Sequence, residues 1–396
     1  MRLLAQCDLA GRGNGGEGMG LVARGGRRLL YVAHESAPVN FTIVDVTEPA
    51  RPAVVRQVEL PHAGVRSNSL CVAASGELLA VAYQVARPGL QPAGVELFDL
   101  ARPDEPRSIA FHDTSGPHSR GAHFVWLAGE RAFLATGLPD FEPTGPRDDQ
   151  VVVILDVAEP SRPHELGRWW LPGTRTGDAE PPPDRHPVHD AGFRAHNVNV
   201  YPERPDRAYV GYLDGGVVIL DIADPGRPRL VSRLDYHPPL PGFTHTVVPL
   251  LDRGLLAVTD EAVTDGCRDH PKLLWLMDAS WESNVVPIAT APLPPAEDFC
   301  ARGGRFGAHN LHENDPSPTA WRSQEELVGA FFNAGVRLYD VRDPFRPREV
   351  GHLVPPAPAG SPAGAVQVND VYADERGLLY AVDRFTGGLY VIERTA

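Results

Sequence analysis

The chain has 396 residues, a formal net charge of -14 and 42% hydrophobic residues. This hydrophobic content is enough for a full core and excludes wholesale disorder, and the negative charge argues against nucleic acid or an anionic membrane as a partner. No window approaches the roughly 18 uninterrupted apolar residues of a membrane span.

The cysteines and the N-terminal residues bear on the cellular compartment. The first eight residues have no adequate apolar core for a signal peptide. The four cysteines are scattered and form no pair separated by two residues, which fits a reducing cytoplasm better than a disulfide scaffold. We therefore expect a cytoplasmic protein, with Cys267 and Cys300 as free thiols even if they lie close together. The oligomeric state stays open.

Two apolar segments near the N-terminus introduce a repeat. Residues 3–7 form a short strand-like run that resembles a later run at 55–59. Between them, Ile43-Val44-Asp45-Val46 is followed by a turn that contains Pro49 and Pro52. Similar segments recur at intervals of 53 to 65 residues, with acidic residues at Asp45, Asp99, Asp156, Asp221, Asp278, Asp340 and Glu393. Seven copies of one period indicate a closed repeat architecture.

Each repeat reads as four short strands. In the fourth repeat, the runs 196–201, 207–212, 216–221 and 230–234 are rich in β-branched and aromatic residues. Gly, Pro and Asp separate these runs. Asp can accept hydrogen bonds from backbone N–H groups of a turn, and proline ends a strand because it cannot donate to the ladder. The sequence thus predicts an all-β fold, a seven-bladed β-propeller of four-stranded blades that forms a single domain over residues 1–396.

The two ends of the chain predict how the ring closes. The C-terminal strand, residues 388–392, matches the third strand of a blade. The N-terminal run resembles a fourth strand. We therefore expect residues 2–8 to complete the last blade, which would pair two otherwise open edges.

A second motif marks the start of each first strand. Phe306-Gly307-Ala308-His309-Asn310 resembles segments around His123, His196 and His245, and weaker copies carry a different residue. The seven equivalent positions are Met19, Asn68, His123, His196, His245, His309 and Asn369. The first strand of a propeller blade lines the central channel, so we expect these side chains to point at one axis.

Four histidines that converge on an axis predict a metal site, because unpaired buried imidazoles are costly and a divalent metal satisfies them. We expect His123, His196, His245 and His309 to hold a divalent metal ion, with Fe(II) favoured and Cu or Zn possible. Tetrahedral zinc would have no open position, whereas six-coordinate iron would keep two. The alternative is a set of hydrogen-bonded channel histidines around water.

Polar residues near the histidines are candidates for catalytic or positioning roles. We expect Asp260, Glu261 or Glu313 to fix imidazole tautomers, and Asn369 to bind water or substrate. Arginines precede several axial positions and could clamp a carboxylate of a small-molecule substrate. These arginines are Arg66, Arg120, Arg194 and Arg305, with Arg384 in a nearby loop. The alternatives are solvated loop charges, strand caps and arginines paired with the protein's own carboxylates.

With both motifs in view, the chain resembles the LVIVD-repeat family of β-propellers. The resemblance is carried by the Ile-Val-Asp-Val segment at 43–46 and its copies, their Pro turns, and Val368-Asn369-Asp370-Val371-Tyr372. It covers nearly the whole chain and implies a fold more than an activity. The arrangement of histidines on the propeller axis is also similar to the metal sites of carotenoid cleavage oxygenases and of selenium-binding protein/methanethiol oxidase. Both are propellers with axial histidines and a metal. Beyond the histidines, no local motif of either is present.

Three functions fit these features. The first is a metal-dependent oxygenase or oxidase that acts on a small organic substrate. The second is a redox-neutral hydrolase, lyase or isomerase in which the metal polarises a carbonyl or activates water. The third is a non-catalytic interaction scaffold, which a channel without metal would favour.

Overall fold

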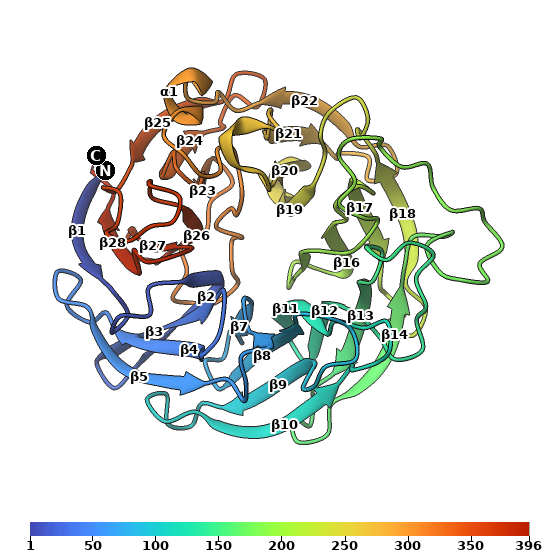
Figure 1. The fold of residues 1–396 in the computed structure, drawn as a ribbon, viewed down its shortest axis with the longest axis horizontal. Coiled ribbons are helices and arrows are strands. Elements are labelled where there is room, and N and C mark those ends of the chain that lie inside the picture. The colour runs from blue at the N-terminus through green and yellow to red at the C-terminus, as the bar shows by residue number, and fades with distance from the viewer. Residues whose placement is uncertain (396) are drawn as a thin grey trace.

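Seven blades surround a central axis (Figure 1), in a computed structural model that describes residues 1–395. The predicted all-β seven-bladed propeller is confirmed, while Ala396 of the expected domain lies outside the described residues. Blade one contains β2 (Gly15–Arg24), β3 (Arg27–His34), β4 (Val39–Asp45) and β5 (Ala53–Glu59). Blade two contains β6 (Val65–Arg66), β7 (Leu70–Val72), β8 (Leu78–Val85), β9 (Gly94–Asp99) and β10 (Arg107–Asp113).

The middle of the chain forms three regular four-stranded blades. Blade three contains β11 (Ala122–Ala128), β12 (Arg131–Thr136), β13 (Val151–Asp156) and β14 (His164–Trp169). Blade four contains β15 (Val198–Tyr201), β16 (Arg204–Gly211), β17 (Val217–Asp221) and β18 (Arg229–Leu234). Blade five contains β19 (Thr244–Leu250), β20 (Leu255–Asp260), β21 (Leu274–Asp278) and β22 (Val286–Thr290).

The last two blades depart from this regular pattern. Blade six contains β23 (Glu326–Ala330), β24 (Val336–Asp340) and β25 (Arg348–Leu353). Its inner edge is an irregular segment, which meets the sheet through isolated bridges at Phe306 and Leu311. Blade seven contains β26 (Val368–Ala373), β27 (Leu378–Asp383), β28 (Leu389–Glu393) and β1 (Arg2–Cys7).

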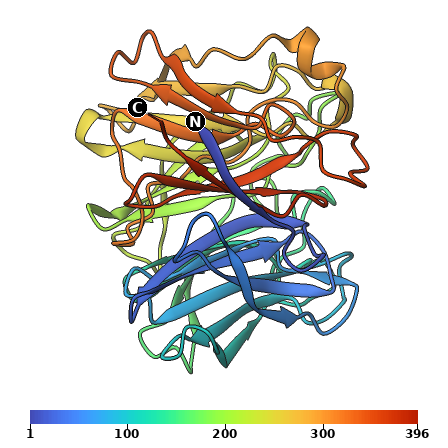
Figure 2. The same cartoon turned by 90° about the vertical axis from the view of Figure 1, so that its left-hand side faces the viewer.

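The N-terminal strand closes the ring, as predicted. β1 pairs antiparallel with β28, from Arg2 opposite Glu393 to Cys7 opposite Leu389. Both termini therefore lie side by side at the rim of blade seven (Figures 1 and 2). This pairing covers the outer edge of β28, which would otherwise present unpaired backbone groups.

The core lies between neighbouring blades, because each middle strand is covered by sheets on both of its faces. In β13 every residue before Asp156 is buried, and β17 shows the same pattern before Asp221. The helical segments are short: η1 (Leu251–Arg253), η2 (Asp265–Cys267) and α1 (Ala296–Cys300). Within residues 1–395, no helix has the length and hydropathy that a membrane crossing requires.

One expectation about the cysteines is wrong. Cys267 and Cys300 form a disulfide, so they are not free thiols. The bond joins η2 in blade five to α1, which lies in the connection to blade six. The sequence did not show this pairing because 33 positions separate the two residues, and only the packing of the two blades brings their loops together. Cys7 and Cys71 are free.

Candidate metal centre

The axial histidines lie in β-bulges at the inner edge of their blades. In blade four, His196 N–H donates to Gly211 O at 2.8 Å, and Gly211 N–H donates to Asn197 O at 3.0 Å, so two residues oppose one. His309 and Asn310 oppose Ala330 in the same way. Register shifts in β11 and β19 fall at His123 and His245. A bulge re-aims a side chain out of the sheet, and here it turns each imidazole toward the axis.

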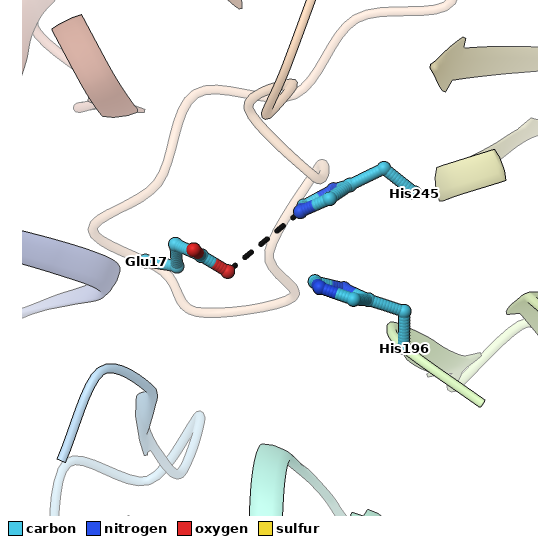
Figure 3. A group of neighbouring side chains, drawn as sticks. All are labelled: Glu17, His196 and His245. Atoms are coloured by element: carbon cyan, nitrogen blue, oxygen red, sulfur yellow. Dashed lines mark ion pairs between the residues drawn. The ribbon is translucent and has the colours of Figure 1, made fainter. Parts of the chain in front are cut away.

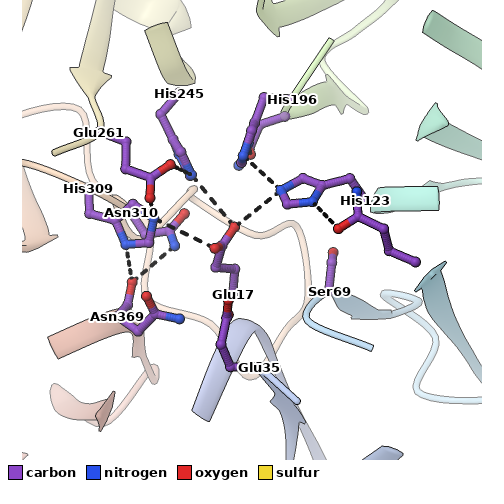
Figure 4. Close-up of polar contacts among 12 residues, drawn as sticks. Glu17, Glu35, Ser69, His123, His196, His245, Glu261, His309, Asn310 and Asn369 are labelled. Carbon is purple, nitrogen blue, oxygen red and sulfur yellow. Dashed lines mark hydrogen bonds and ion pairs between the residues drawn. The ribbon is translucent and has the colours of Figure 1, made fainter. Parts of the chain in front are cut away.

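The four imidazoles form an arc around the axis (Figure 4). The ring centroids of neighbouring histidines lie 4.2 Å apart for His123 and His196, 4.0 Å for His196 and His245, and 4.5 Å for His245 and His309. The Nε2 atoms of His123 and His196 are only 2.7 Å apart. All four side chains are nearly or completely buried. The structure thus brings together the four histidines that the sequence selected.

The outer nitrogen of each imidazole has a partner. His123 Nδ1 lies 3.2 Å from Gln84 Oε1, and His196 Nδ1 lies 2.8 Å from Asn197 Oδ1. His245 Nδ1 lies 2.7 Å from Thr246 Oγ1, and His309 Nδ1 lies 2.6 Å from the Asn369 carbonyl oxygen. Amide and carbonyl oxygens only accept hydrogen bonds, so Nδ1 donates to them in His123, His196 and His309. In neutral imidazoles this leaves the Nε2 lone pairs facing the axis.

Glu17 is a fifth member of this cluster that the sequence reasoning missed. Its carboxylate lies 3.5 Å from His123 Nε2, 3.7 Å from His245 Nε2 and 3.8 Å from His309 Nε2. Figure 3 shows Glu17 pointing across the axis toward His196 and His245. The assignment of Met19 to the axial position of blade one is therefore wrong. Met19 is instead paired with Val32 in the β2–β3 ladder.

The reason is a wide irregularity in β2. Gly15 pairs with His34 and Met19 with Val32, so β2 has two more residues between these pairs than β3. Glu17 lies in that stretch, and its N–H donates to Asn68 O of blade two at 2.5 Å. A Cβ at Gly18 would lie 2.4 Å from Leu70 N, so only glycine permits this close approach. An acidic residue flanked by glycines was the available signal in the sequence.

Burial and neighbouring charges shift the pKa values of the cluster. Burial lowers the pKa of His196 and of His309 well below the usual histidine value, and proximity to His245 adds to both effects. Burial also lowers the pKa of His123. For Glu17, burial opposes ionisation, but the neighbouring imidazoles of His123, His245 and His309 hold the pKa well below its usual range. Burial thus favours the neutral form of His123, His196 and His309 beside the Glu17 carboxylate, and imidazole with carboxylate is a donor set for a cation.

The predicted acidic neighbours differ in position. Glu261 reaches the axis, with its carboxylate 3.9 Å from His245 Nε2 and 3.6 Å from His309 Nε2. Asp260 does not, because its carboxylate accepts hydrogen bonds from Tyr236 and Trp275 within blade five. Glu313 does not contact an axial histidine directly. It accepts a hydrogen bond from Asn197 Nδ2 at 2.6 Å, and Asn197 Oδ1 contacts His196 Nδ1.

Asn369 and Arg194 lie beside the cluster. The carbonyl of Asn369 orients His309, and its side-chain oxygen accepts from Arg384 at 2.9 Å. Arg194 donates to Gln150 Oε1 at 3.3 Å and lies 3.8 Å from Asp149. Burial lowers the pKa of Arg194 to about 10. Asn369 therefore contacts His309 of the cluster directly, whereas the contacts of Arg194 are with Gln150 and Asp149.

The donor atoms fit a metal ion. The ligand atoms of Glu17, His196 and His245 all lie within 4.8 Å of one another, and so do those of His245, Glu261 and His309. The Nε2 atoms of His245 and His309 are buried and have no hydrogen-bond partner. Two Nε2 lone pairs facing each other at 2.7 Å, in His123 and His196, also need a cation or a proton between them. Imidazole with carboxylate is a donor set for first-row divalent metals.

Comparisons with known proteins agree with the fold. The family model of the LVIVD repeat matches residues 195–235, which include all strands of blade four. No curated protein sequence matches the chain. A hypothetical selenium-binding protein from Sulfolobus tokodaii is similar in structure, with a TM-score of 0.59 and 15% identity over 92% of this chain and 90% of the other.

Two further solved structures are similar over most of their length. The β-propeller domain of Cps50 (Swd1) from Myceliophteria thermophila has a TM-score of 0.57 and 16% identity, covering 96% of this chain and 98% of the other. The WD40 β-propeller domain of Doa1 has a TM-score of 0.57 and 9% identity, covering 100% and 97%. At such identities the likeness concerns the fold alone. The chain is therefore a seven-bladed β-propeller that contains the LVIVD repeat.

Proposed function

We propose that this propeller is a metal-dependent enzyme whose divalent metal, with Fe(II) favoured, is held by the four axial histidines and Glu17. The observation that carries the proposal is the convergence of buried Nε2 atoms, two of them without a partner, on one carboxylate. A channel of ordinary hydrogen-bonded histidines would have no need for a buried carboxylate at its centre, since burying a charge is costly unless it is paired.

The ligand set supports a proposal for the reaction class. We place this protein with oxygenases or oxidases that act on a small organic substrate. When bound, the metal would supply redox chemistry, and five protein ligands would leave one position of an octahedral ion for a reactant. Glu17 would take one of the two positions that four histidines alone would leave open.

The surrounding residues keep the ligands oriented and balance their charge. Nδ1 partners set the direction of each imidazole, because a ligand histidine is held by the hydrogen bond of its other nitrogen. Arg305 Nη1 donates to Glu261 at 2.7 Å, and Arg384 lies 3.6 Å from Glu17. These two arginines balance the two axial carboxylates, so a divalent ion would add positive charge to a cluster that is otherwise close to neutral.

The test is metal analysis of protein purified without a chelating tag. The wild type is compared with the double variant His196→Ala/His309→Ala. The matched control is His164→Ala/His352→Ala, which removes two exposed histidines of the outer strands. We expect about one iron per chain in the wild type and in the control, and none in the axial variant, with blades folded in all three by circular dichroism.

Other outcomes discriminate between the functions. One iron or copper per chain, followed by substrate-dependent oxygen uptake, supports the oxidase or oxygenase assignment. Stoichiometric zinc would replace it with redox-neutral hydrolysis, lyase or isomerase chemistry. A wild type that holds no metal even after reconstitution would overturn the proposal in favour of an interaction scaffold.

A further inference from the structure

A surface cavity of about 750 Å³ lies beside the histidine cluster, between blades seven, one and six. Loops that the fold places on one face form it: the β1–β2 connection, the β3–β4 loop and the β27–β28 loop. The volume is in the usual range for small-molecule sites, roughly 300–1,000 Å³.

Arginines line one side of the cavity. They are Arg12, Arg305 and Arg384, and the carboxylates in the same lining are Asp8 and Glu35. The guanidinium groups therefore outnumber the carboxylates. Ala37, Pro38, Pro362 and Phe385 provide an apolar wall. A cavity with cationic and apolar sides suits an amphipathic anion.

Several donors in this lining are free. Within residues 1–395, Arg12 forms no side-chain hydrogen bond or ion pair. Arg305 uses only Nη1, which donates to Glu261 and to the carbonyl of Ala262, so Nε and Nη2 remain free. The Oε2 atom of Glu35 is buried and has no partner, which leaves an acceptor for a hydroxyl or amino group. The cavity thus offers donors for a carboxylate and one acceptor for a donor group.

Two of these arginines connect the cavity to the proposed metal centre. Arg384 donates to Glu35 at 2.5 Å and to Asn369 Oδ1 at 2.9 Å, and its guanidinium lies 3.6 Å from Glu17. Arg305 binds Glu261, which lies 3.6 Å from His309 Nε2. A ligand held by these arginines would be one side chain away from the cluster.

We infer that this cavity is the substrate site and that it takes a small organic acid with an apolar body and a hydroxyl or amino substituent. The carboxylate binds Arg12 and Arg305, the substituent faces Glu35, and the apolar body lies against Phe385. This inference rests on the proposed function, because it names the substrate class of the same site.

The experiment measures ligand binding by isothermal titration calorimetry. The probes are 4-hydroxybenzoate and 4-hydroxybenzamide, which match in shape and differ in charge. Both are titrated into protein as purified and into protein treated with a chelator. We expect the acid to bind both preparations and the amide to bind at least about tenfold more weakly, since a charge-assisted hydrogen bond is lost.

Variants locate the site. Arg12→Gln should weaken binding of the acid by about tenfold or more, without changing metal content, because Arg12 contacts none of the metal-binding residues. Arg305→Gln should weaken it as well. The matched control is Arg51→Gln, an exposed arginine in the turn after β4, which should bind the acid as the wild type does.

Clear results would overturn the inference: no binding of the acid, equal binding of acid and amide, or an Arg12→Gln variant that binds like Arg51→Gln. Binding of the acid that depends on Arg12 in a protein without any metal would keep the cavity assignment and refute the metal-dependent function. A protein that contains metal but does not bind the acid would keep the metal-dependent function and refute the cavity assignment.

Discussion

Two features repeat with the same period, the turns that follow the third strands (the rim turns) and the bulges at the axis. Their chemistry differs. In six blades the aspartate that ends the third strand accepts a hydrogen bond from the backbone N–H of the residue two positions later, with N···O distances of 2.8–3.0 Å. The seventh blade has Glu393, which binds Arg2 of the closing strand. At the axis, by contrast, four successive blades supply histidines, His123 to His309, whereas blade one supplies Glu17.

This difference distinguishes residues that support the fold from residues that form the candidate site. A turn needs the same acceptor in every blade, because the backbone geometry is the same in each. An axis shared by all blades needs only enough donors for one ligand, so its residues need not repeat. The four predictions below test whether the rim supports the fold alone and the axis supports the site, starting with the largest effect.

Removal of residues 2–8 should cause the largest loss of stability. β1 would no longer pair with β28, and the outer edge of blade seven would be open. We expect the melting temperature to fall by roughly 10 °C or more, as measured by circular dichroism. An unchanged melting temperature would show that the ring does not depend on this strand. The ion pair between Arg2 and Glu393 is exposed and should contribute little by itself.

His312 should give the axial region a pH-dependent stability. Burial lowers the pKa of His312 to about 4, and its Nε2 lies 2.6 Å from the carbonyl of Trp321. Between pH 6.5 and 4 the unfolded chain binds a proton that the folded chain does not, so the free energy of unfolding decreases as the pH falls. The full effect is about 3 kcal/mol.

The measurement compares urea unfolding of wild type and His312→Gln from pH 7 to pH 4. The buried carboxyls nearby act in the opposite direction, because burial raises the pKa of Glu313 to about 7 and that of Asp315 to about 6. They are present in both proteins, so the difference between the two curves reports His312. Parallel curves would contradict the assignment.

Glu17→Gln should weaken metal binding by about tenfold or more, because it removes the negative charge at the centre of the cluster. The matched control is Met19→Leu, which changes the residue that the repeat pattern places on the axis. We expect Met19→Leu to keep wild-type metal affinity. If the two variants bind a metal equally well in competition with a chromogenic chelator, Glu17 is not a ligand.

Asp221→Ala should have the smallest effect, a loss of about 1 kcal/mol in unfolding free energy, because it removes one hydrogen bond to Ala223 N–H. Metal content should stay at the wild-type level, since Asp221 pairs with Arg207 at one end of the β16–β17 ladder and His196 bonds to Gly211 at the other end. A loss of metal in this variant would mean that the rim and the axis are coupled, contrary to the separation drawn above.

The sequence predicted the blades well because each strand is specified locally. The apolar run before Asp221 is preceded by glycine and followed by prolines, and the other repeats keep a similar apolar run before an acidic residue. The predicted run 196–201 extends two residues beyond β15 (Val198–Tyr201). His196 and Asn197 form the bulge instead of the regular strand. The repeated motif located the histidine, but it did not show that two residues there oppose one on the neighbouring strand.

Repetition within the chain was enough to determine the seven-bladed ring, the closing strand and the four axial histidines, since each rests on a pattern of strand and turn residues. Tertiary structure alone decided that Glu17 replaces Met19 at the axis and that Cys267 pairs with Cys300. It also decided that Glu261 reaches the cluster while Asp260 stays in its blade. For Asp260 and Glu261 the physical reason is that neighbouring residues of an extended chain face opposite sides. Glu17 takes the place of Met19 because β2 has two extra residues there. Which side chain reaches the axis therefore depends on bulges, and contacts between blades determine those bulges.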